Sequence, residues 1–148
     1  MARISSRCAV VGAVALSAVV AVTTVASPAL AATHLPTLKV TPSTKLVNKE
    51  KVQLTGTGYP KKHKVYAIEC LNTAASLTGC DVAHRVSFTT TAAGTLPKKF
   101  FFTVHTGKLG TGKSAGTCGT TTKNAKKCSI AIGSGSRSYA GAPIVFKG

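Results

Sequence analysis

The sequence predicts an all-β protein, a seven-stranded, immunoglobulin-like antiparallel β-sandwich with two local disulfides. Three observations support this fold class. Short runs of β-branched and aromatic residues are separated by turn residues at intervals of about eight to twelve positions. After the N-terminal segment, no stretch repeats apolar residues at helical spacing without Gly, Pro or Thr interrupting it. In the same region, four cysteines form two pairs of equal spacing.

The N-terminal segment has the three parts of a secretory signal peptide. Arg3 and Arg7 supply positive charge, residues 9–22 are apolar and small, and residues 27–31 end in an A-x-A cleavage pattern. We therefore assign residues 1–31 to a signal peptide and residues 32–148 to the sandwich domain. A membrane anchor is the alternative, but the segment is rich in Ala, Gly, Ser and Thr, and no basic cluster follows it directly. The processed protein is expected to be secreted, extracellular and monomeric.

Seven runs account for the predicted strands. Within them, alternate residues are apolar, so one face of each strand can line a core between two sheets. On this pattern Tyr66, Ile68 and Cys70 point into the core, and Glu69 points to solvent. The strands are residues 38–41, 51–57, 64–71, 85–90, 96–105, 128–133 and 142–147. Predicted loops, rich in Gly, Ser, Pro or Lys, are residues 59–64, 106–117 and 133–139.

Removal of the signal peptide takes Cys8 away and leaves four cysteines, which allow three disulfide pairings. Cys70 and Cys80 are ten residues apart, and so are Cys118 and Cys128. This spacing, with turn-rich residues inside both intervals, favours two local disulfides, each contributing about 3 kcal/mol through loop closure. A four-cysteine zinc site is the alternative, but zinc ribbons use closer pairs and an exported protein tends to oxidise its thiols. No metal or other cofactor is expected.

The charge balance argues against most enzyme classes. The chain has 19 Lys and Arg residues against 3 Asp and Glu residues, and its net charge falls from +16 to +14 when the two signal-peptide arginines are removed. So few carboxylates make acid–base pairs, acidic metal cages and a Ser–His–acid triad hard to assemble, and the G-x-S-x-G motif is absent. The four histidines are scattered, without metal-ligand spacing. We therefore expect a binding protein and not an enzyme.

One motif matches a phosphate-binding loop. Residues 107–114 read G-x-x-x-x-G-K-S, but that loop needs a preceding strand, a following helix and a distant acid for magnesium. The Gly- and Thr-rich residues 115–119 that follow are poor helix formers. The segment is therefore expected to be a flexible basic hairpin loop and not a nucleotide site.

Several segments in a fixed order resemble the neocarzinostatin family of enediyne-antibiotic apoproteins. They are V-T-P-S at 40–43, T-G-T-G-Y at 55–59, the first cysteine loop, and a second cysteine pair before the last strands. The resemblance extends over residues 38–146 and implies a sandwich with two local disulfides. It also implies a cleft that shields a labile, DNA-cleaving chromophore, and hence an antibiotic, antimicrobial and DNA-binding role.

The cleft of that family carries aromatic side chains that hold the chromophore, and the equivalent positions of this sequence are polar. They lie just after the first cysteine of the pairs, a few residues after the second, and in the loop before the third, which places Asn72, Arg85 and Lys108 there. With Ser129 and Gly133, near the start and at the end of the predicted strand 128–133, these residues are the predicted ligand cleft. Lys108, Arg85 and Ser129 favour a polar or anionic small molecule over a bare polyene.

Charge supplies the alternative function. A cationic secreted protein can bind DNA, anionic cell-wall polymers or bacterial membranes without any small-molecule ligand. Because no recognition helix is predicted, contacts with DNA would be to its phosphates. Ordinary solvation of the lysines is the simpler interpretation of the same charge. The predicted polyanion contacts are Lys61, Lys62, Lys64, Lys98, Lys99, Lys126 and Lys127.

Overall fold

The computed structural model describes residues 35–147, so the predicted signal peptide lies outside the described residues. No helix within these residues is long and apolar enough to cross a membrane. The strands are β1 (Lys39–Thr41), β2 (Lys51–Thr55), β3 (Lys64–Leu71), β4 (Val86–Thr89), β5 (Phe100–Thr103), β6 (Gly107–Leu109), β7 (Gly116–Cys118), β8 (Cys128–Ser134) and β9 (Arg137–Ile144). Two short 3-10 turns are η1 (Leu77–Gly79) and η2 (Gly112–Ser114).

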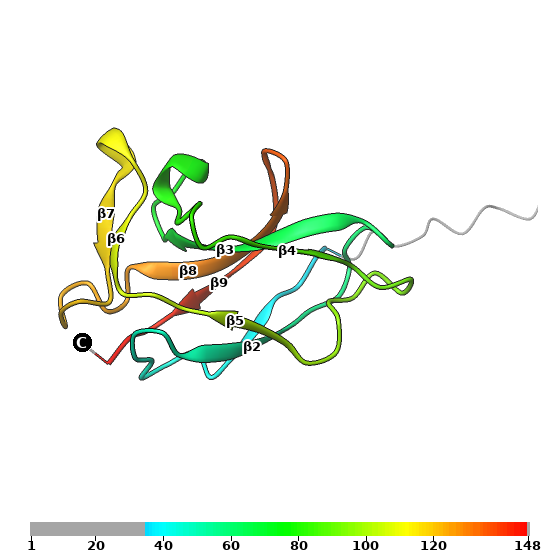
Figure 1. The fold of residues 1–148 in the computed structure, drawn as a ribbon, viewed down its shortest axis with the longest axis horizontal. Helices are drawn as coiled ribbons and strands as arrows, with labels where there is room; N and C mark the ends of the chain where they lie inside the picture. Colours follow the sequence, from blue (N-terminus) through cyan, green and yellow to red (C-terminus); the bar gives the residue numbers. More distant parts are fainter. Residues whose placement is uncertain (1–34, 148) are drawn as a thin grey trace, which may run out of the picture. The chain divides into compact units, whose positions relative to one another are not determined.

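Seven of the strands form two antiparallel sheets. One has three strands in the order β1-β2-β5, and the other has four in the order β4-β3-β8-β9. Figure 1 shows them as two layers, with β2 and β5 in one and β3, β8 and β9 in the other. Each of these strands overlaps one of the seven that the sequence pattern predicts, and the all-β fold class is confirmed.

The strand count is nine and not seven, because β6 and β7 pair with each other in a separate antiparallel ribbon. The ribbon lies within the segment predicted as a Gly-rich loop, and Figure 1 shows it beside η1, directed away from the β2 and β5 layer. Three-residue strands that include Gly and Thr carry too little apolar alternation to be recognised. β9 likewise begins at Arg137, inside a predicted loop.

The core fills the space between the two sheets. Phe102 of β5, which is 1% exposed, contacts a cluster drawn from both layers. Alternation correctly places the inward side chains of β2, β5 and β8, and Phe101 of β5 points outward at 52% exposed. Fully buried members include Val52, Leu54, Val104, Ile130, Ile132 and Ile144.

The side chains of β3 point to the opposite faces from those predicted. Tyr66, Ile68 and Cys70 do not enter the core between the sheets, but form a second buried cluster with Cys80 on the opposite face of β3. The prediction was wrong because all residues from Val65 to Cys70 are buried. A strand covered on both faces has no polar side for alternation to identify. The position of Glu69 is reversed as well, since its side chain is 1% exposed.

Candidate functional site

Both predicted disulfides are present, and one of them shapes a cleft. The Cys70–Cys80 bond joins the end of β3 to the residue after η1, and the Cys118–Cys128 bond joins β7 to the start of β8. The first bond holds the intervening loop over the outer face of the four-stranded sheet, where Asp81 N–H donates to the carbonyl of Glu69. The space left between this loop and the sheet is a cleft of about 220 Å³, here named the disulfide cleft.

The disulfide cleft has an apolar floor and a polar edge. Ile68, Ala131 and the Cys70–Cys80 bond lie at the sheet and disulfide side, and Leu77 lies on the loop side. Hydroxyl groups of four serines and the amide of Asn72 provide hydrogen-bonding capacity, and no carboxylate lines the cleft. The polar lining residues are Asn72, Ser76, Ser129, Ser136 and Ser138.

The wall formed by β8 and β9 combines a close backbone approach at Gly133 with open space at Gly141. The register shifts between Ile132 and Gly133, and a Cβ at Gly133 would lie 2.6 Å from the carbonyl oxygen of Arg137, so a larger residue does not fit there. The Tyr66 hydroxyl donates to the carbonyl of Gly135 at 2.7 Å and fastens the β8–β9 turn to β3. At Gly141, by contrast, a Cβ would meet only the carbonyl oxygen of Ile130, at 3.8 Å.

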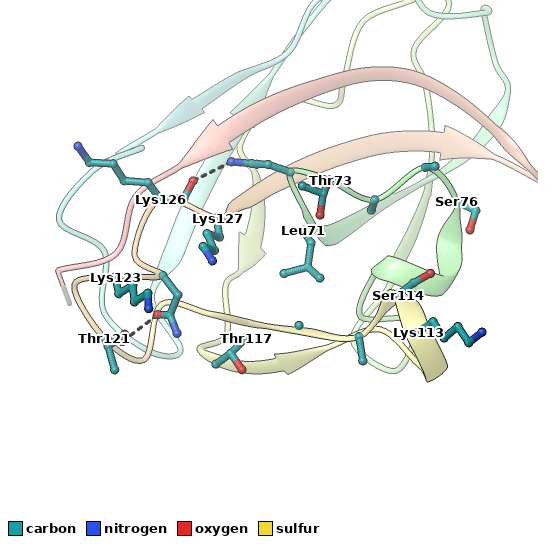
Figure 2. A pocket seen from close by; sticks show the side chains of 16 residues that line it. Leu71, Thr73, Ser76, Lys113, Ser114, Thr117, Thr121, Lys123, Lys126 and Lys127 are labelled. Atoms are coloured by element: carbon teal, nitrogen blue, oxygen red, sulfur yellow. Dashed lines mark hydrogen bonds between the residues drawn. The ribbon is translucent and has the colours of Figure 1, made fainter.

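A second and larger hollow of about 700 Å³ lies on the other side of the loop that follows β3 (Figure 2). Figure 2 shows Leu71 directed into it, with Thr117 of β7 opposite and Lys123 and Lys127 on one side. Asn72 fixes this wall, because its side-chain amide donates to the carbonyl of Lys126 at 2.7 Å. The lysines that line this lysine hollow are Lys113, Lys123, Lys126 and Lys127, and no carboxylate lines it.

Three of the five predicted ligand residues line the disulfide cleft, and two do not. Asn72, Ser129 and Gly133 line the disulfide cleft. Arg85 does not line it but lies beside it, with its guanidinium carbon 5.2 Å from the ring centre of Tyr66, a lining residue. Lys108 lies on the exposed side of β6, opposite Thr117, and lines neither hollow.

Sequence reasoning places the cleft at the first cysteine loop and residues 128–133 but does not single out its apolar residues. Leu77, Ala131 and Gly141 line it, yet aliphatic and small residues carry no chemical signal of their own. Only the position of Leu77 inside the first cysteine loop could have indicated its place.

The basic contacts predicted for polyanions occupy several separate places. Lys61, Lys62 and Lys64 are exposed at the turn into β3, and Lys98 and Lys99 are exposed just before β5. Of the seven predicted polyanion contacts, only Lys126 and Lys127 line the lysine hollow. Its other two lysines, Lys113 and Lys123, are not among the predicted contacts.

Three other chemical possibilities are resolved by the fold. The phosphate-loop motif continues into strand β7 and not into a helix, so it lacks the architecture that holds a nucleotide. The four cysteines that could have formed a zinc site are joined in disulfides. The histidines are less dispersed than their sequence positions indicate, because the rings of His84 and His105 stack with centres 4.1 Å apart.

Glu69 lies in the core beside the second disulfide. Its Oε2 accepts a hydrogen bond from the backbone N–H of His105 at 2.8 Å, and its Oε1 lies 3.3 Å from Sγ of Cys118. Burial raises the pKa of Glu69 to about 7, against the opposing effect of the His105 N–H and with a further increase from the Asp81 carboxylate. The carboxyl group is therefore neutral through most of the acidic range.

The chain is similar to known proteins over most of its length. The sequence model of the neocarzinostatin family matches residues 38–146. Among solved structures, macromomycin has 24% sequence identity and a TM-score of 0.57, and the match covers 75% of this chain and 98% of that one. For apokedarcidin the identity is 24% and the TM-score 0.49, over 76% of this chain and 98% of that one. No curated protein sequence matches the chain.

Proposed function

Since the chain belongs to the neocarzinostatin family, we propose that it is a secreted small-molecule-binding protein whose ligand occupies the disulfide cleft. The observation that carries this proposal is the cleft itself, which combines an apolar floor with a few hydroxyl and amide groups, as small-molecule sites do. The family resemblance supports a chromophore of the antibiotic type as the ligand class. A carrier of this kind performs no catalysis.

The residues around the cleft favour a ligand with a flat apolar part and a polar or anionic group. Ile68, Leu77 and Ala131 offer an apolar surface, while Ser129 and Asn72 offer hydrogen bonds. Arg85 adds a positive charge beside the cleft that is held over the Tyr66 ring. No carboxylate lines the cleft to repel an anion.

The test uses 1-anilinonaphthalene-8-sulfonate, an aromatic anion whose fluorescence rises in an apolar site. The protein has no Trp, so its own emission interferes little. We expect saturable 1:1 binding to the folded chain. Gly141→Val directs a side chain into the cleft without a backbone clash, and it should weaken the binding at least tenfold, or about 1.4 kcal/mol.

A matched control adds the same valine elsewhere. Thr55→Val places it on the exposed end of β2, in the opposite sheet, and should leave the affinity unchanged. Near-ultraviolet circular dichroism verifies that both variants keep native packing. Equal affinity of Gly141→Val and the parent protein would contradict the cleft as the binding site.

Export is part of the proposal. Two disulfides suit an oxidising compartment, and the N-terminal segment has the pattern of a signal peptide. N-terminal sequencing of the protein from culture fluid should begin at Ala32. A secreted chain that begins at Met1 would contradict cleavage after Ala31.

Binding of anionic polymers such as DNA is a second candidate function, favoured by the lysine hollow. Its four lysines lie around one concavity without a carboxylate among the lining residues. Binding through phosphates predicts that affinity for duplex DNA falls steeply with salt, with a logarithmic slope of about −0.9 for each phosphate neutralised. A flat salt dependence would contradict this function.

Charge-matched variants separate the hollow from overall charge. Lys123→Glu with Lys127→Glu changes the hollow, whereas Lys39→Glu with Lys51→Glu makes the same charge change on exposed positions of β1 and β2. The first pair should weaken DNA binding at least about tenfold more than the second. Equal losses would show that net charge alone is responsible.

A further inference from the structure

A group of one carboxylate and two imidazoles lies apart from both hollows. Asp81 follows the first cysteine loop, His84 lies in the turn before β4, and His105 follows β5. Each offers one ligand atom within 4.8 Å of the others. We name Asp81, His84 and His105 the His–Asp cluster. It includes no residue of the disulfide cleft or of the lysine hollow.

Glu69 of β3 accepts a hydrogen bond from the backbone of each of two cluster members. Its backbone carbonyl accepts a hydrogen bond from the Asp81 N–H at 2.8 Å. Its carboxylate accepts one from the His105 N–H, also at 2.8 Å. The third member is held to the first, since His84 Nδ1 lies 2.6 Å from Asp81 Oδ2 and the His84 N–H donates to Asp81 Oδ1 at 3.3 Å.

Carboxyl and imidazole groups are scarce in this protein, so their grouping in the His–Asp cluster is notable. Residues 35–147 contain three side-chain carboxyl groups and three histidines. One carboxylate and two histidines form the cluster, and the Glu69 carboxyl contacts its backbone, in a region that is otherwise strongly basic. Nearby Lys49 adds to the positive charge that His105 experiences. Surface electrostatics alone do not account for a concentration of scarce acids and imidazoles at one place.

One atom of the cluster lacks a partner. The Nδ1 of His105 is buried and makes no hydrogen bond within the described residues. A buried imidazole nitrogen without a partner is costly, and such exceptions call for an explanation such as an ion. A metal ion bound by His105 would provide the missing interaction.

We propose that the His–Asp cluster binds one divalent transition-metal ion of the zinc type, through Asp81 and one imidazole nitrogen from each histidine. Imidazole with carboxylate suits zinc or copper, whereas magnesium and calcium prefer sets of oxygen ligands. Three protein ligands leave a position for water in a four-coordinate zinc site. The inference rests on these residues and is independent of what occupies the disulfide cleft.

Metal binding requires the two imidazole rings, which are stacked with an interplanar angle of 26°, to reorient toward a common point. Ligand atoms around tetrahedral zinc lie about 3.3 Å apart, given metal–ligand distances of about 2.0–2.1 Å. Asp81 Oδ2 and His84 Nδ1, which lie 2.6 Å apart, therefore separate slightly as the metal enters between them. The His84 side chain is 55% exposed and is free to turn toward the ion.

Isothermal titration of the metal-free full chain with zinc chloride tests the proposal. We expect one zinc ion per chain with a dissociation constant in the micromolar range, and no comparable binding of magnesium. His84→Ala and Asp81→Asn should each weaken zinc binding at least about tenfold. His63→Ala removes a histidine that contacts Ser134, far along the chain from the cluster, and should leave zinc binding unchanged.

Nitrogen chemical shifts of the imidazoles give a second readout, since those of His84 and His105 should move together on zinc addition while that of His63 stays. His84 is exposed, so its alanine variant tests the site even where His105→Ala fails to fold. The proposal is overturned by absence of binding at about 1 mM zinc. Equal affinities of His84→Ala and the parent protein, or magnesium binding as tight as zinc binding, would overturn it as well.

Discussion

Replacement of Glu69 by glutamine should remove a pH dependence of stability that this buried carboxyl group imposes. Its pKa in the folded chain is raised by burial to about 7, from an ordinary value of 4.5. The folded chain therefore holds the proton more tightly than the unfolded chain does. The stabilisation from the protonated carboxyl is complete below pH 4.5 and is lost as the pH rises through about 7.

The magnitude follows from the size of the shift. A difference of one pKa unit corresponds to about 1.4 kcal/mol, so this group lowers the free energy of unfolding by about 3 kcal/mol between acidic and slightly basic pH. Glutamine keeps an oxygen that can accept the His105 N–H bond but carries no ionisable proton. The variant should therefore equal the parent at acidic pH and exceed it in stability above pH about 7.

Urea unfolding followed by circular dichroism measures the effect, with disulfides intact and a chelator present. Titration of His105, whose pKa is lowered by burial, changes stability in the opposite direction over part of the same range. The difference between the parent and Glu69→Gln is informative because His105 is present in both proteins. Parallel stability profiles of the two proteins across this range would refute the reasoning.

Two further predictions concern packing and hydrogen bonding. Phe102→Ala, at a position 1% exposed in the core, should lower the free energy of unfolding by about 3–5 kcal/mol, and a loss below about 1 kcal/mol in urea titrations would contradict the assigned core. Tyr59→Phe removes a hydroxyl that donates to the carbonyl of Thr37 at 2.7 Å and should cost about 1 kcal/mol. Because burial raises the pKa of Tyr59 to about 12, the same variant should remove the last-titrating tyrosine from ultraviolet difference spectra, whereas its persistence would contradict this assignment.

The sequence predicts the strands of the two main sheets because each overlaps a run of β-branched and aromatic residues bounded by turn residues. The equal cysteine spacing also predicts both disulfides. Alternation fails at β3, where Val65 faces one buried layer and Ile68 another. It fails again for the β6–β7 ribbon, whose short strands are held by pairing and by the Cys118–Cys128 bond more than by apolar pattern.

The cleft and the His–Asp cluster are harder to predict from sequence, because they depend on contacts between segments that are distant along the chain. Asn72, Ser129 and Gly133 are found through the family resemblance, and they do line the disulfide cleft. The exposed and open position of Gly141 depends on the pairing of β9 with β8 at the edge of the sheet, which no local pattern reports. The meeting of His84 with His105 likewise depends on the return of the chain through β5.

Native mass spectrometry of the protein purified from its own culture fluid tests the central claim, binding of a small molecule in the disulfide cleft, most directly. We expect a monomer of residues 32–148 with two disulfides and an additional small-molecule mass, which is lost on denaturation. We also expect that Gly141→Val, produced in the same way, carries no such mass. A bare polypeptide mass for the parent protein, or an equal additional mass on the variant, would contradict the claim.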